Sequence, residues 1–200
     1  MNIKESIKQF LPKYLSETEQ KNLLKEISDF PNNLDSRFYT RVLKNELTIF
    51  QGDGIKGLEI SNLPSHDYLN AKCLITSNTC DIAPENKRLF ESRLTYCPII
   101  DLEKYISNLE MQKIDSAKIE NHIKDLKAQR ITQILYLPSN DKIKDSIVFL
   151  DRINNSPTSV ITKANIKSKR LFTLSNYGFY MLLLKLSISF TRIGEGVDRK

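Results

Sequence analysis

The sequence contains little cysteine, histidine or glycine, and each scarcity narrows the range of functions. Its three cysteines, Cys73, Cys80 and Cys97, cannot all pair within one chain, which favours a reducing compartment and predicts a cytoplasmic location. Their spacing lacks the closely placed cysteine pair of structural zinc sites, even when His66 is counted as a fourth ligand. We therefore expect no metal and no other cofactor.

Long hydrophobic runs are missing as well. No basic and then apolar leader opens the chain, so secretion is not expected. The apolar segment near the C-terminus is shorter than the roughly twenty residues that a bilayer span requires, which argues against a membrane protein. Gly52 and Gly54 flank Asp53 in a predicted tight turn, and neither a P-loop nor a dinucleotide-binding glycine pattern follows them.

Positive charge is concentrated in the last quarter of the chain. Residues 151–200 contain nine Lys or Arg and three Asp or Glu, so they carry the whole net charge of +6. Clustered cations such as those in Lys163–Arg170 can contact phosphates, because each neutralised phosphate releases counterions. The side chains that we predict to do so are Arg152, Lys169, Arg170 and Arg192. The alternative is an ordinary solvated surface.

One polar segment is the best candidate for chemistry. Residues 70–82, NAKCLITSNTCDI, begin with an apolar, β-branched run that predicts a buried strand and continue with small polar residues that end strands. Functional groups are often placed at such a strand end. The candidate catalytic residues are Asp53, Ser77, Asn78, Thr79, Cys80 and Asp81. The alternative is structural: Ser77 and Asn78 satisfy backbone groups, Asp81 caps a turn and Cys80 is a small buried hydrophobic residue.

Apolar periodicity predicts a mixed α+β fold. With 40% hydrophobic and 27% charged residues, the chain is expected to be globular, with a helical hairpin over 1–36 packed on an α+β domain over 37–200. A helical insertion over 101–130 is predicted, with Asp101 and Ser116 as caps, and a C-terminal helix over 175–191 is predicted, with Ser175 as its cap. Strands are predicted at 38–43, 47–50, 57–60, 71–77, 96–100, 132–137, 146–150 and 170–173.

Four short segments follow one another along the chain: Gly52-Asp53, the strand that ends in Ser77-Asn78, the segment Tyr96–Ile100, and a serine-led apolar strand that runs from Ser146 into Asp151-Arg152-Ile153. In this order residues 47–162 resemble the MazF/PemK toxin family. Those proteins are small SH3-like barrels that cut single-stranded RNA. The resemblance implies a small antiparallel SH3-like barrel or curved sheet, and a nucleic-acid ligand.

Two catalytic positions of that family differ in this chain. The family's arginine, which precedes a proline ahead of the strand, has no counterpart, because the residues Tyr68–Lys72 stand there. The family's catalytic hydroxyl falls at Ile100. Without a cation or an acid beside the scissile phosphate, RNA cleavage loses its main electrostatic support. Lys72 can replace the arginine as a point charge, which makes it a further predicted phosphate contact.

These observations favour an intracellular protein that binds RNA or DNA in a toxin–antitoxin or phage-defence context, without the family's RNA cleavage. Two other classes stay open. One is a hydrolase that uses Cys80 as a nucleophile or the Ser77–Asp81 cluster. The other is a regulatory module whose N-terminal hairpin or terminal helix docks a partner protein. Binding that weakens steeply with salt would favour the nucleic-acid hypothesis. The sequence leaves the oligomeric state open.

Overall fold

The computed structural model describes residues 35–190 apart from 63, 66 and 87, together with residues 16–18, 21, 22 and 25. The chain divides into two compact units, residues 1–33 and 34–200. The predicted N-terminal helical hairpin falls almost entirely outside the described residues, and so does His66. The sheet and the candidate site both belong to the second unit.

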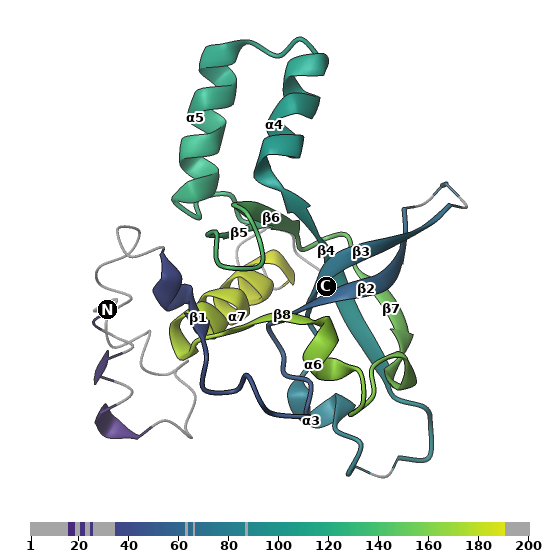
Figure 1. Ribbon diagram of the computed structural model, residues 1–200. Helices are drawn as coiled ribbons and strands as arrows, with labels where there is room; N and C mark the ends of the chain where they lie inside the picture. The colour runs from purple at the N-terminus through teal and green to yellow at the C-terminus, as the bar shows by residue number, and fades with distance from the viewer. Residues whose placement is uncertain are drawn as a thin grey trace, which may run out of the picture. The chain divides into compact units, whose positions relative to one another are not determined.

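The second unit is built on an open antiparallel sheet (Figure 1), which confirms the α+β class. The strand order is β1-β8-β2-β3-β4-β6-β5, and β7 pairs with the first half of β4. The strands are β1 (Tyr39–Thr40), β2 (Asp53–Ser61), β3 (Tyr68–Ile75), β4 (Arg93–Asp101), β5 (Ile134–Leu137), β6 (Ser146–Phe149), β7 (Asn154–Pro157) and β8 (Arg170–Leu174).

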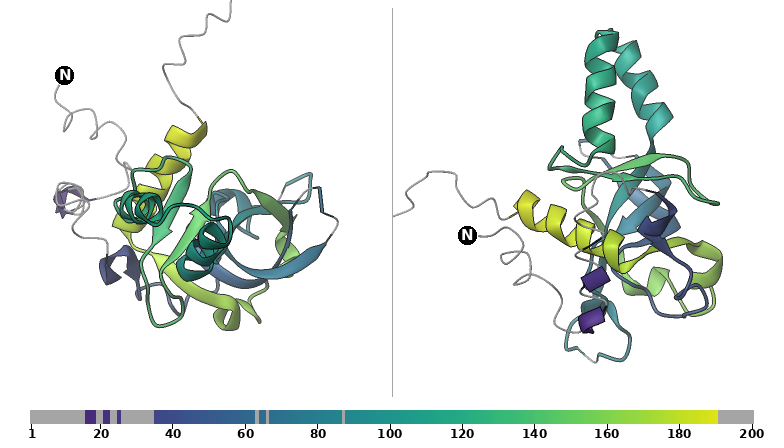
Figure 2. Two further views of the ribbon diagram at one scale, coloured as in Figure 1. Left: turned by 90° about the horizontal axis from the view of Figure 1, so that it is seen from above. Right: turned by 90° about the vertical axis from the view of Figure 1, so that its left-hand side faces the viewer.

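Helices in the described part of the second unit lie between and after the strands. They are the short helices α3 (Thr79–Ile82) and α6 (Ile166–Lys169), the longer helices α4 (Leu102–Met111), α5 (Ser116–Lys127) and α7 (Asn176–Phe190), and the 3-10 turns η1 (Ser36–Phe38) and η2 (Thr158–Val160). Among these described helices none has both the length and the apolar character that a membrane crossing needs. Helices α4 and α5 lie side by side and project from the sheet, as Figure 1 and the right-hand view of Figure 2 show.

The predicted helices of the insertion and the C-terminus are confirmed, with one change of cap. Asp101 occupies the N-cap position of α4, and the Ser175 hydroxyl accepts a hydrogen bond from the Gly178 N–H at the start of α7. For α5 the cap is Asp115, whose carboxylate accepts from the Lys118 N–H, and Ser116 is the first helical residue. An aspartate at this position also suits the positive end of the helix dipole.

The predicted hairpin of residues 38–43 and 47–50 is wrong. Only Tyr39 and Thr40 form a strand, residues 42–45 form a turn, and Val42 is exposed. The β-branched and aromatic residues of this segment have strand propensity, but its carbonyl groups turn inward to a buried arginine described below. Tertiary hydrogen bonds therefore replace the ladder that a hairpin would have formed.

The core contains two apolar clusters along the sheet. One apolar cluster joins β2, β3 and β4 and includes Ile55, Ile75 and Tyr96, all of which are fully buried. The other packs α4 and α5 against β5 and β6 through residues such as Leu126 and Ile147. Helix α7 packs against η1, β8 and β5. It therefore contacts elements near both ends of the strand order. The loops at β1, β8 and α6 are thereby held on one rigid frame.

Candidate nucleic-acid interface

The polar segment after β3 holds loops together. The Ser77 hydroxyl accepts from the Thr95 N–H at 2.6 Å, and the Asn78 side chain caps α3 by accepting from the Cys80 N–H at 2.9 Å. The Thr79 hydroxyl accepts from the Gln51 N–H at 2.9 Å. These side chains satisfy backbone groups, as the structural alternative predicted.

The two remaining residues of that segment lie on α3 and face solvent. Cys80 is an exposed free thiol, so the expectation of a small buried hydrophobic residue is wrong for it. The Asp81 carboxylate pairs with the Arg88 guanidinium at 2.7 Å. Among the described residues, no histidine or carboxylate forms a hydrogen bond with the Cys80 thiol, and an activated nucleophile needs such a base.

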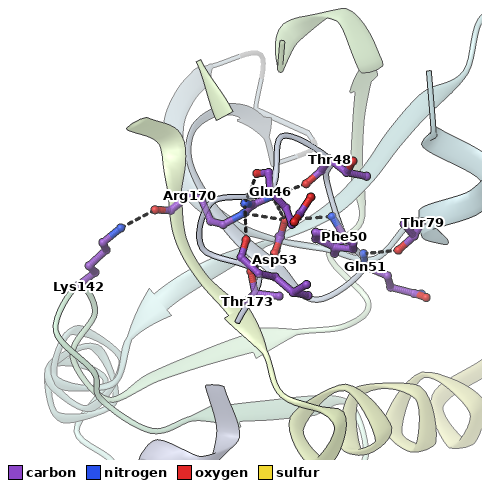
Figure 3. A network of polar contacts seen from close by, with 10 residues as sticks. Glu46, Thr48, Phe50, Gln51, Asp53, Thr79, Lys142, Arg170 and Thr173 are labelled. Carbon is purple, nitrogen blue, oxygen red and sulfur yellow. Dashed lines mark hydrogen bonds and ion pairs between the residues drawn. The ribbon is translucent and has the colours of Figure 1, made fainter. Parts of the chain in front are cut away.

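Asp53 is fully buried at the start of β2 and forms an ion pair with Arg170 at the start of β8 (Figure 3). The Arg170 Nε and Nη2 atoms both lie 3.1 Å from one carboxylate oxygen. The Phe50 N–H donates to this same oxygen at 3.0 Å, and the Thr173 hydroxyl donates to the other oxygen at 2.6 Å. Burial raises the pKa of Asp53, and the Arg170 charge opposes that rise. Asp53 therefore faces the interior and is a structural residue.

Arg170 also corrects a prediction, because its guanidinium is buried and fully engaged. The side chain donates to the carbonyl oxygens of Leu43 at 3.2 Å and Glu46 at 2.8 Å, and to that of Thr48 (Figure 3). It is 5% exposed, so it does not reach a phosphate. Its role is to fix the loop between β1 and β2.

Beside this loop lies a groove of about 620 Å³. Its walls come from β1, β8, the loop after β1, the loop between β5 and β6, and α6. The lining residues are Tyr39, Thr40, Arg41, Lys44, Asn45, Asn140, Asp141, Lys142, Lys167, Arg170, Leu171, Phe172 and Thr173. Four of them are exposed cations, and Asp141 is the one acid in this described lining.

The groove combines positive charge with one partly exposed aromatic ring, that of Tyr39, which packs on the buried Phe172. Arg41 pairs with Asp141 at 3.0 Å, and the Lys142 ammonium donates to the Arg170 carbonyl oxygen at 2.8 Å. The rings of Tyr39 and Phe172 lie 4.8 Å apart, and the Tyr39 ring is half-buried. A mouth of cations over an aromatic surface is the arrangement that binds a phosphate backbone and a base together.

The other predicted phosphate contacts in the described residues do not line this groove. Lys72 pairs with Asp101 at 3.7 Å, the Arg152 guanidinium stacks over the Phe149 ring at 3.9 Å, and the Lys169 ammonium donates to a carbonyl at 3.4 Å. Arg192 falls outside the described residues.

Sequence reasoning missed three of the four groove cations, Arg41, Lys44 and Lys142, because they lie in the neutral part of the chain. Lys167 belongs to the predicted cluster Lys163–Arg170.

In the described part of the chain, no three histidine, cysteine, aspartate or glutamate side chains gather to hold a metal ion. Comparison with protein-family models and with curated proteins finds no match to this chain.

Proposed function

We propose that this protein binds single-stranded nucleic acid, and RNA in particular, through the basic groove, and that it does so without cutting the strand. The observation that carries the proposal is the groove itself, in which Arg41, Lys44, Lys142 and Lys167 surround about 620 Å³ of space and face one carboxylate. This volume suits a nucleotide-sized group, and a double helix is too wide to enter it. A single strand can place a base against Tyr39 and its phosphates on the cations.

The curvature of the sheet supports the resemblance to the barrels of the MazF/PemK family. β1 and β5 are the two ends of the strand order, and the Tyr39 hydroxyl donates to the carbonyl oxygen of Pro138, just after β5, at 2.5 Å. The sheet is open, because β1 and β5 are not paired, but this hydrogen bond brings its two ends together as a barrel-like arrangement would. The proposal therefore keeps an SH3-like barrel, a cytoplasmic location and a toxin–antitoxin or phage-defence context.

Binding without cleavage follows from the side chains at the family's catalytic positions. Lys72, the substitute for the family's arginine, is paired with Asp101, and an apolar Ile100 stands where a hydroxyl would be. The hydroxyls of Ser77 and Thr79 are engaged with backbone groups. At these described positions, neither a positioned acid nor an unpaired cation is present to stabilise a pentavalent phosphate.

The test is a titration of a labelled single-stranded RNA of about 12 nucleotides, followed by fluorescence anisotropy at several salt concentrations. Lys44 and Lys167 are changed together to Gln, which removes two groove cations. We expect affinity at low salt to fall about tenfold and the salt slope to drop by roughly 1.4, since each phosphate contact on a single strand contributes about 0.7.

The matched control changes Lys104 and Lys118 to Gln. Both are exposed lysines, they lie on α4 and α5, and they do not line the groove. The net charge changes by the same amount, so we expect the control to bind as the wild type does. Equal losses in the two double variants would show unspecific attraction, and an RNA that stays unbound by the wild type would refute the proposal.

A further inference from the structure

One acidic side chain, that of Asp141, lines the groove. Asp141 lies at the turn between β5 and β6, and its carboxylate pairs with the guanidinium of Arg41, which lies a hundred residues earlier in the chain. Arg41 and Asp141 both line the groove and both are more than four-fifths exposed. Resting on the proposed function, we infer that Asp141 occupies the place of a phosphate on Arg41 and must be displaced when the RNA strand binds.

The two loops that carry this pair are fixed without it. On one side the Asn140 side chain accepts from the N–H groups of Lys142 and Ile143, which holds the turn around Asp141. On the other side the buried Arg170 binds the carbonyls of Leu43 and Glu46. Breaking the Arg41–Asp141 pair therefore leaves both loops in place.

The exposure of the pair makes the exchange favourable. Solvent-exposed ion pairs contribute about 0.2–1 kcal/mol, because water screens the attraction and two side chains lose freedom. An arginine binds a phosphate through two parallel charge-assisted hydrogen bonds, which are stronger than a single contact with a carboxylate oxygen. In this structure one Nη2 atom contacts one Asp141 oxygen at 3.0 Å. A phosphate therefore replaces the carboxylate at little cost.

This arrangement defines the class of ligand. Within the described residues Lys44 and Lys167 form no ion pair, so a first phosphate binds there without competition. A second phosphate is then needed to replace the Asp141 carboxylate as the ion-pair partner of Arg41. The groove thus favours a strand with several successive phosphates over a molecule with one phosphate. Asp141 weakens the binding of the single-phosphate molecule further, because its carboxylate repels the phosphate.

The test compares Asp141→Asn with the wild type, using the same RNA titration. The amide keeps the size of the side chain and removes its charge. We expect binding to become about three- to fivefold tighter, which corresponds to an exposed pair of up to about 1 kcal/mol, and the salt slope to steepen by roughly 0.7. Asp125→Asn is the matched control, because Asp125 pairs with Arg130 at 2.9 Å on α5 and the net charge changes equally.

A double-mutant cycle with Arg41→Gln tests whether Asp141 acts through Arg41. When Arg41 is absent, the gain from Asp141→Asn should shrink to the part that comes from the repulsion between Asp141 and phosphate; a gain that persists in full would overturn the inference. Equal or weaker binding by Asp141→Asn, with a wild type that binds RNA, would also overturn it and leave the proposed function standing. If neither protein binds RNA, the proposed function itself fails. Circular dichroism of each variant verifies that the fold is intact.

Discussion

Replacing Arg170 by Met would remove the central charge of the buried network at the start of β8. The change deletes the ion pair with Asp53 and the hydrogen bonds to the carbonyls of the loop after β1. Asp53 is fully buried, so its charge would be left without a counter-charge, with only the Thr173 hydroxyl and the Phe50 N–H as hydrogen-bond donors. Removing one member of a buried pair costs about 3–5 kcal/mol. We expect the free energy of unfolding to fall by that amount and Tm to fall by roughly 10 °C.

The pH dependence of Arg170→Met gives a second test of the same reasoning. Burial raises the pKa of Asp53, and the Arg170 charge opposes the rise, so the variant raises this pKa further. A carboxyl group whose pKa is raised in the folded state binds protons more tightly there than in the unfolded chain. Stability therefore falls as pH rises from the unfolded-state pKa to the folded-state pKa. The variant should therefore lose less stability at pH 5 than at pH 7.

Urea denaturation of both proteins at the two pH values is the assay. Arg130→Met serves as the control, because Arg130 forms an exposed pair with Asp125 at the same kind of distance, and its loss should cost less than about 0.5 kcal/mol. A loss below about 1 kcal/mol for Arg170→Met, or the same loss at both pH values, would refute the reasoning.

Three further predictions concern α7 and the thiols. Burial lowers the pKa of Lys185 from 10.5 to about 8, so between these pH values the unfolded chain binds more protons than the folded chain. The stability of the wild type should therefore rise by about 3 kcal/mol relative to that of Lys185→Met as pH rises from 8 to 10.5, and urea denaturation measures this difference. Gly178→Ala would place a methyl group against a backbone carbonyl of η1, so we expect a loss of about 1–3 kcal/mol in the urea midpoint analysis, although alanine is the better helix former. Cys80 is exposed, whereas burial raises the pKa of Cys73 and Cys97 to about 12. Iodoacetamide should therefore label Cys80 alone in the native protein. Mass spectrometry that finds the other two cysteines equally labelled would contradict this.

Local sequence patterns predicted most of the regular elements. Helices α4, α5 and α7 have apolar residues at helical spacing and capping residues at their starts, and these signals lie within one segment. The strands β2 to β6 and β8 contain apolar residues, some of them β-branched or aromatic, in segments of the usual strand length. β7, with the sequence Asn154–Pro157, was missed because its residues have low strand propensity and it forms by pairing with β4.

The candidate groove could not be predicted, because its parts are distant in the sequence. Arg41 and Asp141 come from two loops and Lys167 from the short helix α6, and these segments meet only after β1 pairs with β8 and β5 joins the sheet. Each of these residues alone is an ordinary charged residue. A net charge summed over a quarter of the chain identifies a basic region, but the geometry that turns cations into a site is a tertiary property.

Arg170 connects the fold to the groove. From the sequence it was a phosphate contact, because it belongs to a basic cluster; in the structure its guanidinium faces Asp53 while its carbonyl oxygen accepts from Lys142 in the groove. The same guanidinium draws in the carbonyls of residues 43–48, and this shapes the loop that presents Arg41 and Lys44. An arginine suits this task, because its planar fork can bind one carboxylate and several carbonyls at once, whereas lysine offers a single centre. Arg170→Lys should therefore keep the charge and still weaken RNA binding.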